Sequence, residues 1–168
     1  PREQGDQIAG CTVDQAILAA QNLAGLHGPL WSDPSLTEHL APFDARQGAD
    51  LDSVFPTMID MFLDRFGNRV SAETRAVYDE LRDVLGSWFA KRMEPFGLVH
   101  GDYRLDNLLF SPDGTDVAAV DWQTVSLGLP ARDLAYLCGT GLSVPDRRAA
   151  DEEIVAAYHE RLVGHGVT

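Results

Sequence analysis

Cysteine is scarce in this sequence, since only Cys11 and Cys138 occur among its 168 residues. Two cysteines are too few for a disulfide framework, and neither has a second cysteine at the spacing of a metal site. We therefore expect both thiols to be small residues of the core. Because the first residues also show no signal-peptide pattern, we expect a cytoplasmic protein.

Long apolar runs and basic residues are scarce as well. No stretch reaches the roughly 20 apolar residues of a membrane span, so we expect no membrane partner. The chain has 13 Lys and Arg against 26 Asp and Glu, a formal net charge of −13. This balance argues against nucleic acid as a partner, because phosphate backbones require basic surfaces. It suits a cationic substrate, but a solvated acidic surface that keeps the protein soluble explains it at least as well.

The remaining composition is typical of a folded protein. The chain is 45% hydrophobic and 23% charged, which indicates one globular domain over residues 1–168. Thr12-Val13-Asp14-Gln15 has the form of a capping box, and apolar residues then recur at helical spacing until Gly28-Pro29. We expect a helix of about four turns that ends near His27.

Two helices are predicted in the middle of the chain. Residues 31–50 show no sustained period and indicate a loop with at most short turns of helix. A helix is expected to start near Pro56 and to end at Phe66, and Ser71 would cap a longer helix that runs to about Met93. The apolar positions expected on their buried faces are Ile59, Phe62, Leu63, Phe66, Val77, Leu81, Val84, Leu85 and Trp88.

Residues 98–122 contain short apolar runs instead of a helical period. Leu108–Phe110 and Val117–Val120 flank Ser111-Pro112-Asp113-Gly114, in which Pro second and Gly fourth are typical of a type I turn. The pattern predicts a β-hairpin. Such a hairpin would bring Asn107, before its first strand, beside Asp121, after its second.

Two further helices are predicted after the hairpin, one from Asp133 toward Leu137 and one from Asp146 to about Val163. No repeat or low-complexity segment is present. The expected fold class is therefore α+β, mainly helical, with one small hairpin.

The residues around the hairpin point to phosphoryl transfer. That reaction requires alignment of an acceptor hydroxyl and neutralisation of phosphate charge by a divalent metal. Magnesium prefers oxygen ligands and keeps several waters, so one carboxylate and one amide oxygen suffice. We interpret Asp102 as the base that orients the hydroxyl, and Asn107 and Asp121 as magnesium ligands through which the nucleotide is also held.

Other polar residues nearby have simpler explanations. His100 titrates near neutral pH, but we favour a supporting role in which it braces the loop. Arg104 and Asp106 either touch substrate or phosphate or form a surface ion pair, and we favour the ion pair. Asp133 is explained by the preference of a first helical turn for acids.

These motifs resemble a known family. His100-Gly101-Asp102 with Asn107 is similar to the catalytic loop of the aminoglycoside phosphotransferase and choline kinase superfamily, and Asp121-Trp122 to its metal-binding segment. Residues 128–136 and 23–27 resemble further segments of that family. The resemblance implies the larger, C-terminal lobe of a kinase-like fold, with the catalytic loop and metal-binding hairpin at residues 98–122.

Departures from protein kinases narrow the expectation. Gly101 stands where protein kinases usually carry an arginine that reads activation-loop phosphorylation, which favours a small-molecule acceptor. The only lysine, Lys91, is in a helical pattern, and Gly139-Thr140-Gly141 lacks a third glycine, so no nucleotide-covering lobe is visible. We therefore expect a fragment of a kinase-like protein, truncated at both ends and inactive by itself.

The resulting hypothesis is a phosphotransferase that moves the terminal phosphate of ATP or GTP, with Mg²⁺, to a hydroxyl of an aminoglycoside, an amino alcohol or another metabolite. An alternative is a kinase-like binding module that transfers nothing, because the glycine loop and strand lysine are missing. A metal-dependent hydrolase using His100, Asp102 and Asp121 is a third hypothesis, although hydrolase sites usually gather more ligands.

Overall fold

The computed structural model describes residues 1–40, 45–91 and 94–168. These residues form two compact units, one made of Pro1–Ala41 with Pro95–Thr168 and the other of Pro42–Glu94. Both are described separately below. Among the described residues, no helix is long and apolar enough to cross a membrane.

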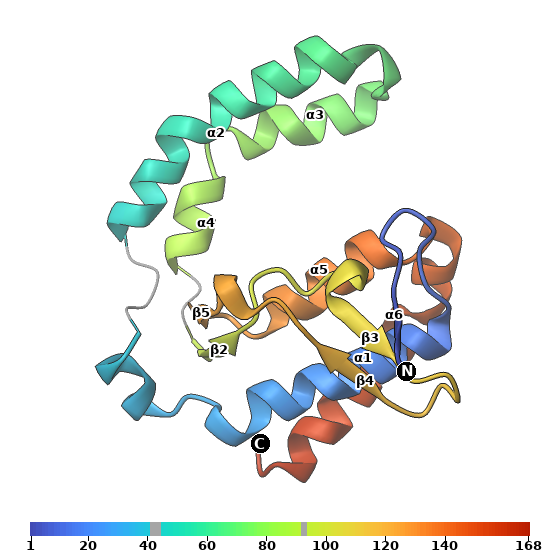
Figure 1. Ribbon diagram of the computed structural model, residues 1–168. Coiled ribbons are helices and arrows are strands. Elements are labelled where there is room, and N and C mark those ends of the chain that lie inside the picture. The colour runs from blue at the N-terminus through green and yellow to red at the C-terminus, as the bar shows by residue number, and fades with distance from the viewer. Residues whose placement is uncertain (41–44, 92–93) are drawn as a thin grey trace. The chain divides into compact units, whose positions relative to one another are not determined.

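The first unit is built on helices α1 (Val13–His27), α5 (Ala131–Gly141) and α6 (Val144–Gly164) (Figure 1). Helix α1 begins at the predicted capping box, in which the Thr12 hydroxyl accepts the N–H of Gln15 at 3.2 Å and the Gln15 side chain accepts the N–H of Thr12 at 3.0 Å. Helices α5 and α6 both extend beyond their predicted limits at each end. The early start of α6 has a local cause, because Ser143 and not Asp146 caps this helix.

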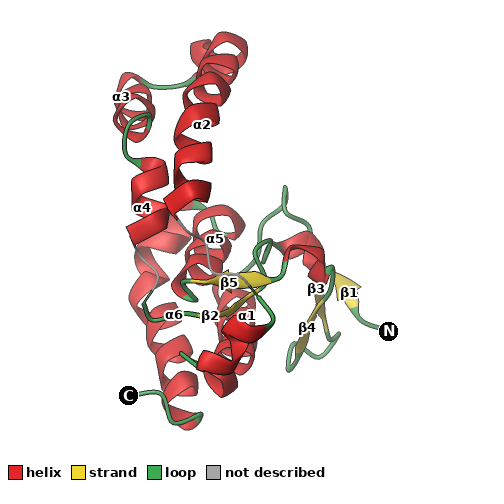
Figure 2. Ribbon diagram, turned by 90° about the vertical axis from the view of Figure 1, so that its left-hand side faces the viewer, coloured by secondary structure: helices red, strands yellow, loops and turns green. Residues whose placement is uncertain are grey.

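Two small antiparallel sheets complete this unit. In one, β3 (Leu108–Phe110) lies between β1 (Glu3–Gln4) and β4 (Val117–Ala119), at one edge of the unit in Figure 2. In the other, β2 (Gly97–Val99) pairs with β5 (Ser126–Gly128). The predicted β3–β4 hairpin is confirmed, with Leu108 opposite Ala119 and the Gly114 N–H bonded to the Ser111 carbonyl at 3.0 Å.

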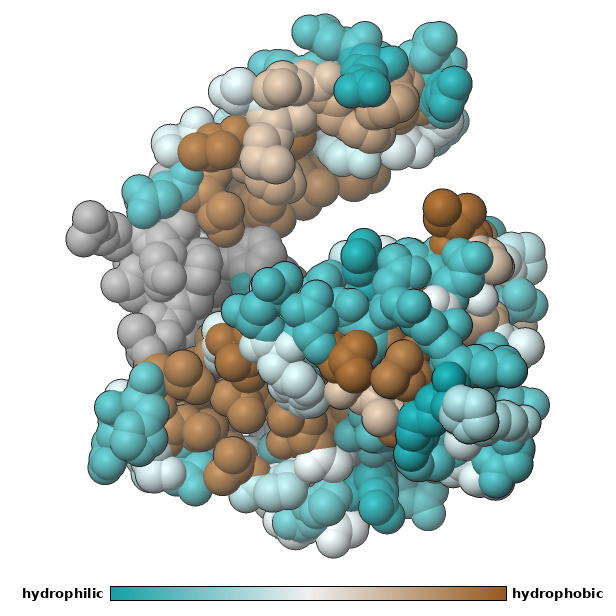
Figure 3. Space-filling model, viewed as in Figure 1, coloured by the Kyte–Doolittle hydropathy of each residue, from teal (hydrophilic) through white to brown (hydrophobic). Residues whose placement is uncertain are grey.

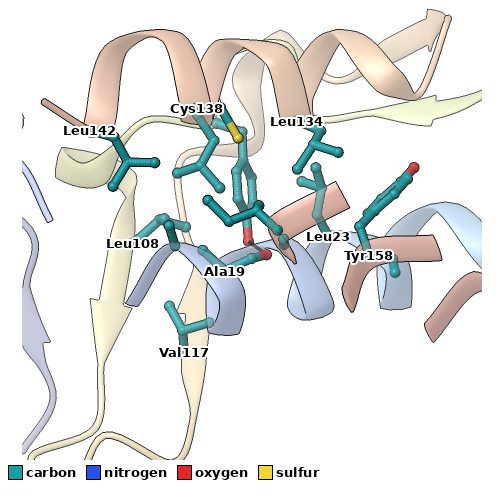
Figure 4. Close-up of a cluster of buried hydrophobic side chains, with 14 of the residues drawn as sticks. Ala19, Leu23, Leu108, Val117, Leu134, Cys138, Leu142 and Tyr158 are labelled. Atoms are coloured by element: carbon teal, nitrogen blue, oxygen red, sulfur yellow. Dashed lines mark hydrogen bonds between the residues drawn. The ribbon is translucent and has the colours of Figure 1, made fainter. Parts of the chain in front are cut away.

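The core of the first unit lies where α1, α5 and α6 meet the β3–β4 hairpin. Its side chains include Leu23, Leu108, Leu134 and Tyr158, which belong to the cluster drawn in Figure 4. Burial of this kind stabilises a fold by roughly 25 cal/mol for each Å² of apolar surface removed from water. Cys138 is part of the core and Cys11 packs against it, as expected for small apolar residues.

The second unit consists of α2 (Ala45–Phe66), α3 (Ala72–Leu81) and α4 (Leu85–Lys91). The prediction of a loop up to residue 50 is wrong over its last part, because α2 begins at Ala45 and contains Pro56 in its interior. Before it, a short 3-10 helix spans Pro34–Glu38.

The single long helix predicted after Ser71 is also wrong, since the chain turns between α3 and α4. Its expected end at Met93 falls outside the described residues. Ile59 and Leu63 are buried as predicted, and Phe62 contacts the Tyr78 ring with 5.2 Å between centroids. Val77, Val84 and Trp88, expected on a buried stripe, are 55, 48 and 43% exposed, and Figure 3 shows apolar side chains on the surface of these helices.

The molecule is thus mainly helical with small antiparallel sheets, as the sequence predicts. Strands β1 and β5 were not expected, because they pair with segments far away in the sequence and no turn signal marks them, unlike the β3–β4 hairpin. The expectation of a single domain over residues 1–168 stays a prediction.

Candidate active site

The residues from His100 to Asn107 form a loop between β2 and β3, and His100 fixes its first part. The ring of His100 is fully buried, and its Nε2 lies 2.9 Å from the carbonyl of Val120. Its Nδ1 accepts the N–H of Asp102 at 3.3 Å. Since a carbonyl only accepts and an N–H only donates, this pairing fits a ring with its hydrogen on Nε2. One side chain therefore joins the backbone of Asp102 to the backbone just before Asp121.

Gly101 allows this loop to approach the segment after Asp121. Its φ is +82°, and a Cβ at this position would lie 2.7 Å from the carbonyl oxygen of Thr124. The Thr124 hydroxyl donates to the carbonyl of His100 at 2.8 Å. A glycine is required here both by the left-handed backbone and by the close contact.

Asp102 and Asn107 contact each other directly. The Asn107 side-chain nitrogen donates to the Asp102 carbonyl at 2.9 Å and to its carboxylate at 3.0 Å. Asn107 is 7% exposed, whereas the Asp102 side chain is 31% exposed. The amide nitrogen of Asn107 thus holds Asp102, and its oxygen remains for another partner.

Asp121 lies two residues after the second strand of the hairpin, and its own contact with Asn107 stays a prediction. The N–H of Val120 donates to the carbonyl of Asn107 at 2.9 Å, which continues the β3–β4 pairing up to these two residues. Asp121 itself has a left-handed backbone, with φ 64° and ψ 64°. Such conformations in residues other than glycine are uncommon and concentrate at functional sites.

Trp122, the residue after Asp121, contacts the start of the loop and the hairpin. Its ring lies over His100 with 4.7 Å between centroids, and its Nε1 donates to the carbonyl of Ala119 at 3.2 Å. The indole is anchored at both ends although it is 43% exposed.

Arg104 lies between two carboxylates of the loop. Its guanidinium is 3.5 Å from Asp102 and 3.5 Å from Asp106, and the side chains are 41, 31 and 37% exposed. These distances and exposures agree with the surface ion pairs that we favoured. The Asp106 carboxylate also accepts the N–H of Gln7 at 2.9 Å, which links the loop to the chain before α1.

Two residues of α5 that the sequence analysis did not place in the site contact the loop. The Asp133 carboxylate, 3% exposed, accepts the N–H of His100 at 2.6 Å and the N–H of Gly101 at 3.0 Å. One turn later, partial burial and then the adjacent negative charge of Asp102 raise the pKa of Tyr136. The sequence did not reveal this role of Asp133, because acids are common in a first helical turn and no local signal shows that this side chain is buried.

A model of the phosphotransferase enzyme family matches residues 12–166, which is nearly the whole chain. The chain belongs to this family. The resemblance of the sequence to the aminoglycoside phosphotransferase and choline kinase superfamily is thereby confirmed. The loop, hairpin and α5 contacts described above all lie within the part that matches the phosphotransferase family.

Parts of larger curated proteins resemble this phosphotransferase chain. It is 52% identical over 48 residues to acyl-CoA dehydrogenase family member 10 of Mus musculus, covering 28% of this chain and 4% of the mouse protein. It is 42% identical over 57 residues to acyl-CoA dehydrogenase family member 11 of Gallus gallus, covering 31% of this chain and 7% of that protein. A probable acyl-CoA dehydrogenase of Arabidopsis thaliana is 46% identical over 43 residues, covering 25% of this chain and 5% of the plant protein. The chain therefore spans less than a tenth of the length of each of these relatives.

The predicted donor set fits magnesium better than zinc. An amide oxygen of Asn107 and a carboxylate of Asp121 are oxygen ligands of the kind that Mg²⁺ prefers. Within the described ranges, no group of three or more His, Cys, Asp and Glu side chains is placed to hold a metal. The hydrolase hypothesis, which requires His100, Asp102 and Asp121 as joint ligands, is therefore unsupported, and both His100 ring nitrogens are already engaged.

Proposed function

We propose that this chain contributes the acceptor- and metal-holding part of a phosphotransferase with a kinase-like C-terminal lobe. The reaction would transfer the terminal phosphoryl group of ATP or GTP to a hydroxyl of a small molecule. The observation that carries the proposal is the contact between the Asn107 amide and the Asp102 carboxylate at 3.0 Å, in a loop that leads into the hairpin ending just before Asp121. Base and metal donors thereby meet in one loop and hairpin.

Asp102 would act as the base. Its carboxylate is partly exposed and is fixed by Asn107, so an acceptor hydroxyl can reach it from solvent. The hydroxyl oxygen would form a bond to the terminal phosphorus as the bond to the bridging oxygen of the nucleoside diphosphate breaks, and its proton would pass to Asp102. Arg104 supplies a nearby positive charge that moderates repulsion between this carboxylate and the phosphates.

Asn107 and Asp121 would hold the metal. Bound magnesium would neutralise charge on the phosphate oxygens of the nucleotide. The side-chain nitrogen of Asn107 is occupied by Asp102, which directs the amide oxygen away from it. The αL backbone of Asp121 comes after the second strand and begins a short turn at Trp122–Thr124.

Two classes of acceptor follow from different observations. The net charge of −13 suits cationic hydroxyl compounds, such as aminoglycosides and amino alcohols. The relatives are named as acyl-CoA dehydrogenase family members, which makes hydroxylated acyl thioesters a second class. Acyl thioesters of coenzyme A carry negative phosphates and would be repelled by the acidic protein. Added salt should therefore lower KM for such thioesters and raise KM for cationic acceptors, which distinguishes the two classes.

Nucleotide turnover by the full-length protein tests this function. The protein would be assayed with ATP or GTP, magnesium and each acceptor class, and phosphorylated product detected by mass spectrometry. We expect Asp102→Asn to lower kcat by about 10² to 10⁴, the usual contribution of a general base, with little change in the unfolding midpoint. Asp121→Asn should instead raise the magnesium concentration required for half-maximal rate by about tenfold or more.

Asp106→Asn is the matched control for the base. It makes the same chemical change in the same loop, beside the same Arg104, and its amide oxygen can still accept the N–H of Gln7. We expect it to change kcat by less than about threefold. Unchanged turnover in Asp102→Asn would refute the assignment of the base, and binding of nucleotide without any product would favour the non-catalytic binding module.

A further inference from the structure

A chain of buried polar side chains connects three helices to the catalytic loop. The Tyr158 hydroxyl on α6 lies 2.7 Å from Nδ1 of His27, the last residue of α1. Nε2 of His27 lies 3.4 Å from the Asp133 carboxylate, the same group that accepts the N–H bonds of His100 and Gly101. Tyr158, His27 and Asp133 are 6, 0 and 3% exposed.

The chemistry of the groups fixes the direction of the hydrogen bonds. An ionised carboxylate only accepts, so His27 donates to Asp133 from Nε2. In a neutral ring, Nδ1 then accepts the hydrogen of the Tyr158 hydroxyl. Burial, and after it the charge of Asp133, raise the pKa of Tyr158, so this phenol keeps its hydrogen. The Tyr158 and His27 rings also meet edge to face, with 5.8 Å between centroids.

Packing alone does not explain why the buried side chains of Tyr158, His27 and Asp133 are polar. Tyr158 belongs to the apolar core with Leu23 and Leu134, shown in Figure 4. Apolar side chains of similar volume stabilise such an interior as well as buried polar groups do, or better. The hydrogen bonds add a fixed orientation: Tyr158 orients the His27 ring, and His27 orients the Asp133 carboxylate.

Asp133 connects these side chains to the catalytic loop. Its Oδ2 accepts from His100 and lies near His27, while its Oδ1 accepts from Gly101. Rotation of the carboxylate would release one of the two N–H groups. The contact from His27 opposes this rotation, and the contact from Tyr158 keeps the His27 ring in place.

We propose that His27 and Tyr158 are positioning residues of the catalytic loop. They act through Asp133 to fix the backbone of His100 and Gly101, and so the place from which Asp102 meets the acceptor. The catalytic part of this inference rests on the proposed function, whereas the effect on the backbone does not.

Amide hydrogen exchange in the full-length protein tests the effect on the backbone. We expect Tyr158→Phe and His27→Leu to speed exchange of the His100 and Gly101 amides by about tenfold relative to the unchanged protein. His27→Gln, which retains a donor near the position of Nε2, should restore most of the protection. In turnover assays, the first two variants should lower kcat and leave KM for the nucleotide unchanged.

Ile154→Val is the control for general destabilisation. Ile154 is fully buried one turn before Tyr158 on α6 and carries no polar group. It should lower the unfolding midpoint about as much as the loss of one buried hydroxyl hydrogen bond. Its exchange at His100 and Gly101 should stay within about twofold of the unchanged protein.

Two results would overturn the proposal: unchanged exchange in Tyr158→Phe and His27→Leu, or equally fast exchange in Ile154→Val. A protein that shows the expected exchange pattern but transfers no phosphate with any acceptor would instead refute the proposed function and leave the positioning chain supported.

Discussion

Gly101 occupies a position at which any side chain would meet the backbone. Its φ is +82°, and a Cβ would lie 2.7 Å from the Thr124 carbonyl oxygen. We expect Gly101→Ala to lower the free energy of unfolding by about 3 kcal/mol, of which roughly 1–2 arises from the left-handed backbone and the rest from the clash. Chemical denaturation would measure this loss.

Gly114 offers a control that separates the two causes. Its φ is +69°, but a Cβ added at this position of the hairpin turn would meet no atom within 4 Å. Gly114→Ala should therefore cost only the backbone contribution of about 1 kcal/mol. Equal losses in the two variants would show that the Thr124 contact imposes no constraint on Gly101.

Single residues of the site differed in how well the sequence predicted them. The contact between Asn107 and Asp102 and the β3–β4 hairpin follow from local signals in the sequence, whereas the roles of Asp102, Asn107 and Asp121 stay predictions. Asp133 was not recognised as part of the site, because its partners His100 and Gly101 lie more than thirty residues earlier in the sequence. A contact between residues so far apart in the sequence leaves no periodic pattern and no turn pattern.

At the scale of elements, Pro56 is the clearest anomaly. It lies inside α2, where proline lacks an N–H and its ring crowds the carbonyl four residues before it. We expect Pro56→Ala to raise the free energy of unfolding by about 1–3 kcal/mol. The Pro56 carbonyl, which accepts from Arg82 at 3.3 Å, would be retained in the variant.

Pro145→Ala tests the same change where proline is tolerated. Pro145 lies in the first turn of α6, whose N–H groups have no partner within the helix. Its replacement should change stability by less than about 0.5 kcal/mol. If thermal or chemical unfolding showed the same gain for both variants, the interior position of Pro56 would carry no penalty.

The helices were predicted well where their ends have local causes and poorly where they do not. The capping box of α1 is contained within Thr12 to Gln15 and was read directly from the sequence. The break between α3 and α4 instead coincides with contacts to α2: Arg82 pairs with Asp60 at 2.7 Å, and the Asp52 carboxylate accepts the Gly86 N–H at 2.7 Å. Only tertiary structure supplies these partners.

At the scale of the whole molecule, the two thiols report on global opening. Burial is the main cause that raises the pKa of Cys11 and of Cys138 to about 11, from 9.0. At pH 8 the thiolate fraction should thus be about 100-fold lower in the folded protein than in the unfolded chain. We expect alkylation by iodoacetamide to be slower by about the same factor, and to become fast in guanidinium chloride.

The raised pKa of the two thiols also determines how the stability of the fold changes at alkaline pH. The unfolded thiols release protons from about pH 9, whereas the folded ones retain them to about pH 11. This contribution to stability is therefore present below pH 9 and is lost as the pH rises toward 11. Equal alkylation rates in folded and denatured protein would contradict the burial of both thiols.

Family membership was the property of the whole molecule that the sequence revealed best. A few residues around His100 and Asp121 were enough to identify it, and the family match extends over residues 12–166. The division into two compact units was not expected, because contacts between elements define the units and these contacts leave no local pattern in the sequence.

Trp122 gives the site an optical signal of its own. Its indole contacts the His100 ring at a tilt and follows Asp121 directly, so a cation that reaches this carboxylate changes the electric field at the indole. The sequence holds three tryptophans, and replacing Trp31 and Trp88 with phenylalanine would leave one emitter beside the candidate metal ligand. Occupancy of the site then becomes visible as a change in fluorescence, without a label and without knowledge of the acceptor.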